Sequence, residues 1–132
     1  MIYVDSSVVL AELLAEDRRP GEAFWNETLV SSRLLEYEVW TRVHARNVAR
    51  THGEAARALI GRVALLELVA PVLTRALEPF PSPVRTLDAL HLASAEFLRD
   101  RQRGIRLATY DGRQSAAAKA MGFVLYDIPA RA

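Results

Sequence analysis

The sequence predicts an α/β fold in which a mainly parallel sheet of about five strands lies between two layers of helices. Short apolar runs rich in β-branched and aromatic residues alternate with segments of helical periodicity, which is the order that a parallel sheet requires. The chain has 132 residues, and no internal repeat, low-complexity tract or linker divides it. We therefore expect one domain over 1–132, built as a three-layer α/β/α sandwich.

The predicted elements follow one another along the chain in strand–helix order. Strands are expected over 1–4, 29–32, 67–71, 105–110 and 123–126. Helices are expected over 7–15, 22–27, 33–52, 54–66, 72–78, 86–101 and 113–121. Gly53 is predicted to interrupt the longest helical pattern, residues 79–83 to form a stiff proline-rich loop, and the residues after Tyr126 to form a loose tail.

Composition excludes several classes of protein. Hydrophobic residues make up 51% of the chain and charged residues 25%, which is typical of a globular protein. No apolar run reaches the roughly 18 residues of a membrane span, and no basic segment precedes the first apolar run as in a secretory signal. The absence of cysteine excludes disulfides and thiolate metal sites. We expect a cytoplasmic protein without a membrane partner.

Four acidic residues can be placed at the carboxyl edge of the predicted sheet. Asp5 directly follows the first strand and Asp111 the fourth, and ligands of open α/β sheets bind beyond the carboxyl ends of the strands. Asp88 lies in the first turn of a helix that Thr86 is expected to cap. Glu38 lies beside the apolar stripe of the helix over 33–52.

Each of these acids also has a simpler explanation. Asp5 could cap a helix, and Asp111 could form an Asx turn before a glycine. Asp88 could be an acid that the helix dipole favours in the first turn. Glu38 could face solvent or pair with Arg42 four residues later. Its neighbour Glu36 is a competing candidate for the site, although Glu36 is better placed to be solvated.

Together the four acids indicate a divalent cation. Carboxylates at one edge of a sheet raise one another's pKa values, and a hard cation with oxygen ligands relieves their repulsion. Mg²⁺ accepts few carboxylates, keeps several waters and leaves positions for phosphate oxygens. We therefore expect Mg²⁺ or Mn²⁺ at Asp5, Asp88 and Asp111, with Glu38 completing the cluster. Such a site can activate water for attack on a phosphodiester.

The histidines show no zinc spacing. They are His44, His52 and His91. His91 is expected to pack or to hydrogen-bond within its own helix.

Basic and apolar side chains on the middle helices suggest partners. Net charge is only +1, and Lys119 is the one lysine among 17 basic residues, a bias that GC-rich coding DNA also produces. The arginines that follow Glu38 at steps of four form either a solvated face or a contact surface for single-stranded nucleic acid: Arg42, Arg46 and Arg50. The same region carries many large apolar residues, and part of this surface is expected to bind a protein partner or a second copy of the chain: Trp40, Leu59, Ile60, Val63 and Leu66.

Four motifs give the sequence its resemblance to the PIN-domain family, specifically to VapC-type toxins of toxin–antitoxin pairs. They are Tyr3-Val4-Asp5-Ser6-Ser7, residues 32–38, Leu87-Asp88-Ala89-Leu90-His91-Leu92-Ala93, and Thr109-Tyr110-Asp111 with the later Gly122-Phe123. The resemblance implies a PIN-like fold and a Mg²⁺- or Mn²⁺-dependent endoribonuclease. It assigns the catalytic and metal-binding acids to Asp5, Glu38, Asp88 and Asp111. It also implies an RNA substrate, a homodimer and an antitoxin whose tail occupies the active site.

Three other functions compete with this interpretation. A receiver-like Mg²⁺-binding signalling domain would show an acidic pair after the first strand and a lysine at a later strand end. Here Asp5 is followed by two serines, and Lys119 lies in a predicted helix. A phosphatase with an aspartyl nucleophile would need a second aspartate where Ser7 stands. A catalytically inactive PIN-fold binding protein is the third, although all four acids are present.

Overall fold

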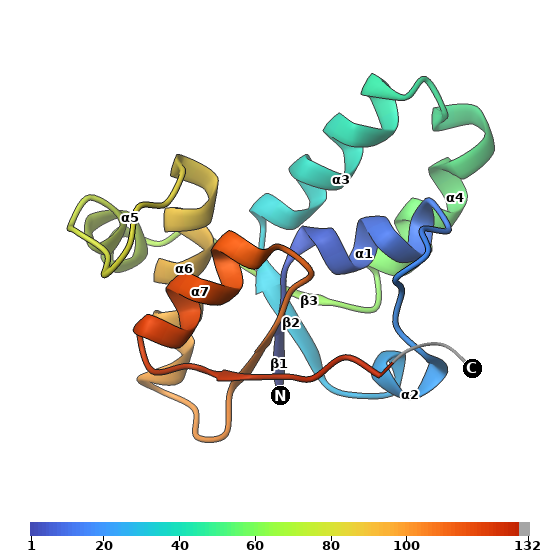
Figure 1. Cartoon of the computed structure of the whole chain (residues 1–132). Coiled ribbons are helices and arrows are strands. Elements are labelled where there is room, and N and C mark those ends of the chain that lie inside the picture. The colour runs from blue at the N-terminus through green and yellow to red at the C-terminus, as the bar shows by residue number, and fades with distance from the viewer. Residues whose placement is uncertain (130–132) are drawn as a thin grey trace.

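A computed structural model describes residues 1–129 around one five-stranded sheet in the order β3-β2-β1-β4-β5, with every pairing parallel (Figure 1). The strands are β1 (Ile2–Val4), β2 (Leu29–Ser32), β3 (Ala64–Leu66), β4 (Arg106–Ala108) and β5 (Val124–Leu125). The helices are α1 (Ser6–Leu13), α2 (Glu22–Trp25), α3 (Leu34–Ala45), α4 (Ala49–Ile60), α5 (Ala70–Ala76), α6 (Thr86–Arg99) and α7 (Gly112–Ala120). The predicted fold class is confirmed.

Two hydrophobic cores cover the two faces of the sheet. Ile2 and Val4 point into a core shared with α1, α3 and α4, whereas Tyr3 points into a second core shared with α6 and α7. This alternation follows from the two-residue period of a strand. Figure 1 shows α6 and α7 on one side of the sheet and α1, α3 and α4 on the other. The three predicted layers are therefore present.

The predicted boundaries in the middle of the chain are wrong. The helix expected over 33–52 is broken at Asn47, which adopts a left-handed conformation with φ 56°, and not at Gly53, which lies inside α4. Asparagine tolerates this conformation better than most residues. The predicted helix over 54–66 ends at Ile60, and Ala64–Leu66 pairs with β2 as a strand, so the strand expected over 67–71 begins too late.

Smaller differences occur at the ends of other elements. The helix α5 begins at Ala70, two residues earlier than expected, with a proline in its first turn, where the missing N–H costs nothing. Residues 127–129 of the predicted tail have no regular structure, and 130–132 lie outside the described residues. Among residues 1–129, no helix is both long and apolar enough to cross a membrane.

The apolar surface predicted on the middle helices is not available to a partner as a whole. Ile60 and Val63 are buried in the core, and Leu66 belongs to β3. Trp40 and Leu59 pack against the same core from its edge. The surplus of large apolar residues is therefore largely explained by burial between α4, α1 and the sheet.

The glycine inside α4 generates a stability prediction. A Cβ added at Gly53 would lie 3.6 Å from the Trp40 ring, an ordinary packing distance. Gly53→Ala should therefore raise the free energy of unfolding by about 0.5–1 kcal/mol, because alanine is the better helix former. Gly104→Ala is the matched control, since Gly104 has open space around it but a φ of +78°. It should lower the stability by about 1 kcal/mol. Urea unfolding measures both, and changes of the same sign would contradict the prediction.

Candidate active site

Asp5 is fixed where β1, α1 and the end of β4 meet. Its backbone N–H donates to the Ala108 carbonyl at 2.9 Å. Its Oδ2 accepts hydrogen bonds from the hydroxyls of Ser7 at 2.6 Å and Thr109 at 2.9 Å, and from the Ser7 backbone N–H at 3.3 Å. Asp5 therefore caps α1, as the simpler explanation proposed, and is also held in place from a second strand.

The hydroxyls of Ser7 and Thr109 also set the position of Asp111. Ser7 Oγ accepts the N–H of Tyr110, and Thr109 Oγ1 accepts the N–H of Asp111 at 2.9 Å. Asp111 Oδ1 then caps α7 by accepting the backbone N–H groups of residues 113 and 114. The carboxyl ends of β1 and β4 are therefore connected by one hydrogen-bond network that includes both aspartates.

Asp88 lies in the first turn of α6, whose cap is Arg85 and not Thr86 as expected. Its Oδ2 accepts the Arg85 backbone N–H at a long 3.4 Å. Burial raises the pKa of Asp88, the Arg85 N–H lowers it, and the charges of Asp111 and Asp5 raise it, with a net increase. The protein therefore stabilises the negative charge of this carboxylate poorly.

Glu38 on α3 is bonded to a histidine from a distant part of the chain. His91 Nε2 lies 2.5 Å from Glu38 Oε1, and His91 Nδ1 lies 2.7 Å from the Tyr3 hydroxyl. His91 is packed in the interior, as one of the two expectations had it, but its hydrogen bonds go to Tyr3 and Glu38 and not to its own helix. Burial lowers the pKa of His91, but the hydrogen bond and charge of Glu38, followed by Asp5 and Asp88, raise it overall. Glu36 instead pairs with Arg33 at 3.1 Å.

All four predicted acids line one pocket of about 680 Å³ at the carboxyl edge of the sheet. Glu36 lines a different hollow on the other side of α3. The acids come from the ends of β1 and β4 and from the facing helices α3 and α6. The structure therefore brings together Asp5, Glu38, Asp88 and Asp111.

Only one of the three predicted RNA-binding arginines lines this pocket. Arg42 does so, whereas Arg46 ends α3 and Arg50 lies in the first turn of α4, so the break at Asn47 separates them. The pocket is also lined by three arginines that the sequence did not suggest: Arg18, Arg85 and Arg113. The last two lie within three residues of Asp88 and Asp111, a proximity that could have identified them. Only the fold reveals Arg18, which stacks 5.0 Å from the Tyr110 ring.

The four carboxylates share one feature that bears on a cation. In each, one oxygen accepts a hydrogen bond, and the other accepts none from residues 1–129. No group of three or more acidic or histidine side chains in that range is placed to hold a metal ion. The donors are all carboxylate oxygens, which suits Mg²⁺ or Mn²⁺ bound by few direct ligands and several waters. The residues present therefore fit a hydrated divalent cation.

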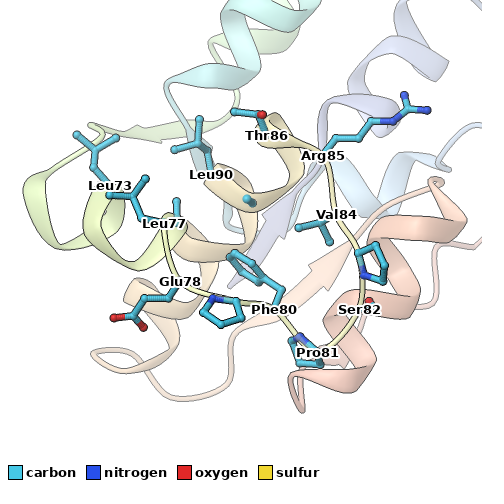
Figure 2. Close-up of a pocket in the computed structure, with 14 residues that line it drawn as sticks. Leu73, Leu77, Glu78, Phe80, Pro81, Ser82, Val84, Arg85, Thr86 and Leu90 are labelled. Atoms are coloured by element: carbon cyan, nitrogen blue, oxygen red, sulfur yellow. The ribbon is translucent and has the colours of Figure 1, made fainter.

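An apolar groove adjoins the acidic pocket, and Arg85 and Thr86 line both. Figure 2 shows Leu77, Phe80 and Val84 around this groove, while the Arg85 guanidinium points away from it. Leu77 is 88% exposed, the most of any large apolar residue described. The main exposed apolar surface is therefore on α5 and the loop before α6, not on the middle helices.

A family model for the PIN domain matches residues 2–120, which include all four acids. The chain belongs to the PIN-domain family. Ribonuclease VapC47 of Mycobacterium tuberculosis (strain CDC 1551 / Oshkosh) is 31% identical over 131 residues, 94% of each chain. Ribonuclease VapC46 of Mycobacterium tuberculosis (strain ATCC 25618 / H37Rv) is 32% identical over 130 residues, 94% of this chain and 95% of that one.

The solved structure of a toxin has the same fold. The crystal structure of Mycobacterium tuberculosis VapC20, described as a sarcin-ricin loop cleaving toxin, superposes with a TM-score of 0.68 and 24% identity. The superposition covers 98% of this chain and 100% of that chain. Together the relatives confirm the resemblance to VapC-type toxins and the enzyme class, an endoribonuclease. The receiver-like alternative is therefore wrong.

The unequal anchoring of the acids generates a prediction. Asp5→Ala removes the α1 cap and leaves two hydroxyls without their acceptor, so unfolding should become easier by about 1–2 kcal/mol. Asp88→Ala removes a poorly neutralised carboxylate and should change the stability by less than about 0.5 kcal/mol. Urea unfolding in EDTA measures both. Equal destabilisation by the two substitutions would show that the network around Asp5 has no special role.

Proposed function

We propose that this PIN-domain protein is a Mg²⁺- or Mn²⁺-dependent endoribonuclease toxin that hydrolyses phosphodiester bonds in single-stranded or loop RNA. The observation that carries the proposal is the convergence of Asp5, Glu38, Asp88 and Asp111 on one pocket, each with one oxygen that accepts no hydrogen bond from residues 1–129. A divalent cation bound there would activate a water molecule and offset charge on the phosphate oxygens.

The protein's own contribution is to hold the carboxylates in place. Ser7 and Thr109 fix Asp5, and the N-terminus of α7 fixes Asp111. A carboxylate whose second oxygen is already bonded cannot rotate freely, so less order has to be created when a cation and substrate bind. A cation would stabilise the charged form of Asp88, because burial and the neighbouring acids raise the pKa of this carboxyl group.

Substrate binding is proposed for the arginines around the pocket. Arginine forms paired hydrogen bonds with phosphate oxygens, and its charge opposes the repulsion between RNA and the acids. Arg42 is the predicted arginine that lines the pocket, and Arg18, Arg85 and Arg113 join it. Arg46 and Arg50 are exposed on the neighbouring turn and helix, where they could contact phosphates farther along the strand.

A cognate antitoxin and a second copy of the chain are the proposed protein partners, and the cytoplasm is the proposed location. VapC relatives support the antitoxin. Light scattering on the chain alone, and on its mixture with the product of an adjacent small gene, measures both assemblies. A mass that stays monomeric in both samples would contradict this part of the proposal.

The reaction is tested with a mixed RNA pool in Mg²⁺, Mn²⁺ or EDTA, followed by end-group analysis. Cleavage should require the cation and leave a 5′-phosphate and a 3′-hydroxyl, because a water nucleophile does not use the RNA 2′-hydroxyl. Asp88→Asn should lower the rate by about 100-fold or more. Asp100→Asn, at the exposed opposite end of α6, is the matched control and should cleave normally. Activity in EDTA, or 2′,3′-cyclic phosphate ends, would refute the mechanism.

The arginine proposal is tested by RNA binding in EDTA, where cleavage is absent. Arg42→Ala should weaken binding and reduce the slope of log K against log salt by about 0.7, the value for one phosphate contact on a single strand. Arg62→Ala is the control, since Arg62 is exposed but does not line the pocket. Identical slopes for the two variants would contradict a phosphate contact at Arg42.

A further inference from the structure

A buried hydrogen-bond chain connects the interior of the protein with Glu38. The Tyr3 hydroxyl on β1 lies 2.7 Å from His91 Nδ1 on α6, and His91 Nε2 lies 2.5 Å from Glu38 Oε1 on α3. Tyr3 is 0% and His91 1% exposed, whereas the Glu38 side chain is 20% exposed. The chain therefore starts in the core behind the sheet and ends at the acidic pocket.

The chemistry of these groups fixes the direction of one bond. A carboxylate only accepts hydrogen bonds, so His91 Nε2–H is the donor to Glu38 whether the imidazole is neutral or protonated. The Tyr3 hydroxyl bonds to His91 Nδ1. It donates to this nitrogen when the imidazole is neutral and accepts from it when the imidazole is protonated. The two rings also meet edge to face, with centroids 5.8 Å apart. The imidazole therefore has a partner on each side and little freedom to turn.

Nothing else in the described residues holds the carboxylate of Glu38. His91 is its one hydrogen-bond donor within residues 1–129, and Arg42 forms no ion pair with it there. Glu38 has a long, flexible side chain on the partly exposed side of α3. Without His91, this carboxylate could swing towards solvent or towards Arg42. One histidine therefore determines which way the acid points.

We infer that His91, held by Tyr3, is a positioning residue that fixes the Glu38 carboxylate so that its second oxygen serves the pocket. The inference rests on the proposed function, in which Glu38 belongs to the acidic site. His91 is not a catalytic residue, because it is buried and does not line the pocket. It acts on the cation and the substrate only through Glu38.

Two substitutions of His91 separate its two contacts. The amide nitrogen of glutamine reaches close to the position of imidazole Nε2, so His91→Gln can still donate to Glu38. The amide of asparagine lies close to the position of Nδ1, so His91→Asn keeps the contact with Tyr3 and loses the contact with Glu38. Both variants lose the ring and remain polar, which makes each the control for the other. Glu38→Gln supplies the reference for losing the acid itself.

The measurements are Mn²⁺ affinity by calorimetry, kcat and KM for RNA cleavage, and crystal structures of the variants without metal. His91→Asn should lower Mn²⁺ affinity by about 10- to 100-fold and lower kcat at unchanged KM, and Glu38→Gln should have the same effects. His91→Gln should retain most of the wild-type Mn²⁺ affinity and most of the wild-type kcat. Equal defects in the two variants, or a more active His91→Asn, would show a purely structural role and overturn the inference.

The crystal structures distinguish this inference from the proposed function. The Glu38 carboxylate should keep its orientation in His91→Gln and change it in His91→Asn, and an unmoved carboxylate in His91→Asn would overturn the inference. A wild-type protein that neither binds Mn²⁺ nor cleaves RNA would overturn the proposed function. The orientation of the Glu38 carboxylate in the variants would still decide whether His91 positions it. If neither His91 variant folds, Tyr3→Phe decides: a lower kcat at unchanged KM supports the inference, and wild-type kcat overturns it.

Discussion

Hydrogen bonds to the carboxylate of Asp5 connect the end of β1 with the end of β4 and with the start of α1. A nearly buried carboxylate is tolerated only when hydrogen bonds replace the water it loses, and here two hydroxyls and a backbone N–H do so. Because the same two hydroxyls also accept N–H groups after β4, the backbone that carries Asp111 is set by the network around Asp5. The geometry of the candidate active site thus depends on the hydrogen bonds among Asp5, Ser7 and Thr109.

The topology explains why acids from distant parts of the sequence meet. Strands β2, β1 and β4 are adjacent and parallel, so the residues that follow them emerge at one edge. The helix α3 starts just after β2, and α6 packs across the sheet with its first turn at the same edge, which brings Glu38 and Asp88 to the pocket. Repulsion between the carboxylates of such a cluster lowers the stability of the folded state until a proton or a cation neutralises them. Loss of stability of this kind is common at functional sites.

Local patterns in the sequence were enough to place the four acids at one edge of the sheet, but they did not predict which residues surround them. Asp5 and Asp111 follow apolar strands directly, so their place at the sheet edge depends only on the order of elements. The break at Asn47 was missed because a left-handed asparagine leaves no glycine or proline signal. Residues 63–66 fit both a helical stripe and a strand, and only pairing with β2 decides between them. His91, which bonds to Glu38, lies 53 residues away along the sequence, and only the tertiary fold brings the two side chains into contact.

The proposed chemistry of this protein requires that the acidic pocket bind a divalent cation. Anomalous diffraction from crystals grown with Mn²⁺ tests this claim most directly, because it locates the ion without assuming any activity. We expect a single strong peak in the pocket, about 2.1 Å from at least one oxygen of Asp5, Asp88 or Asp111, with waters completing the coordination. A pocket without a peak at millimolar Mn²⁺, or an ion bound only elsewhere on the protein, would contradict it.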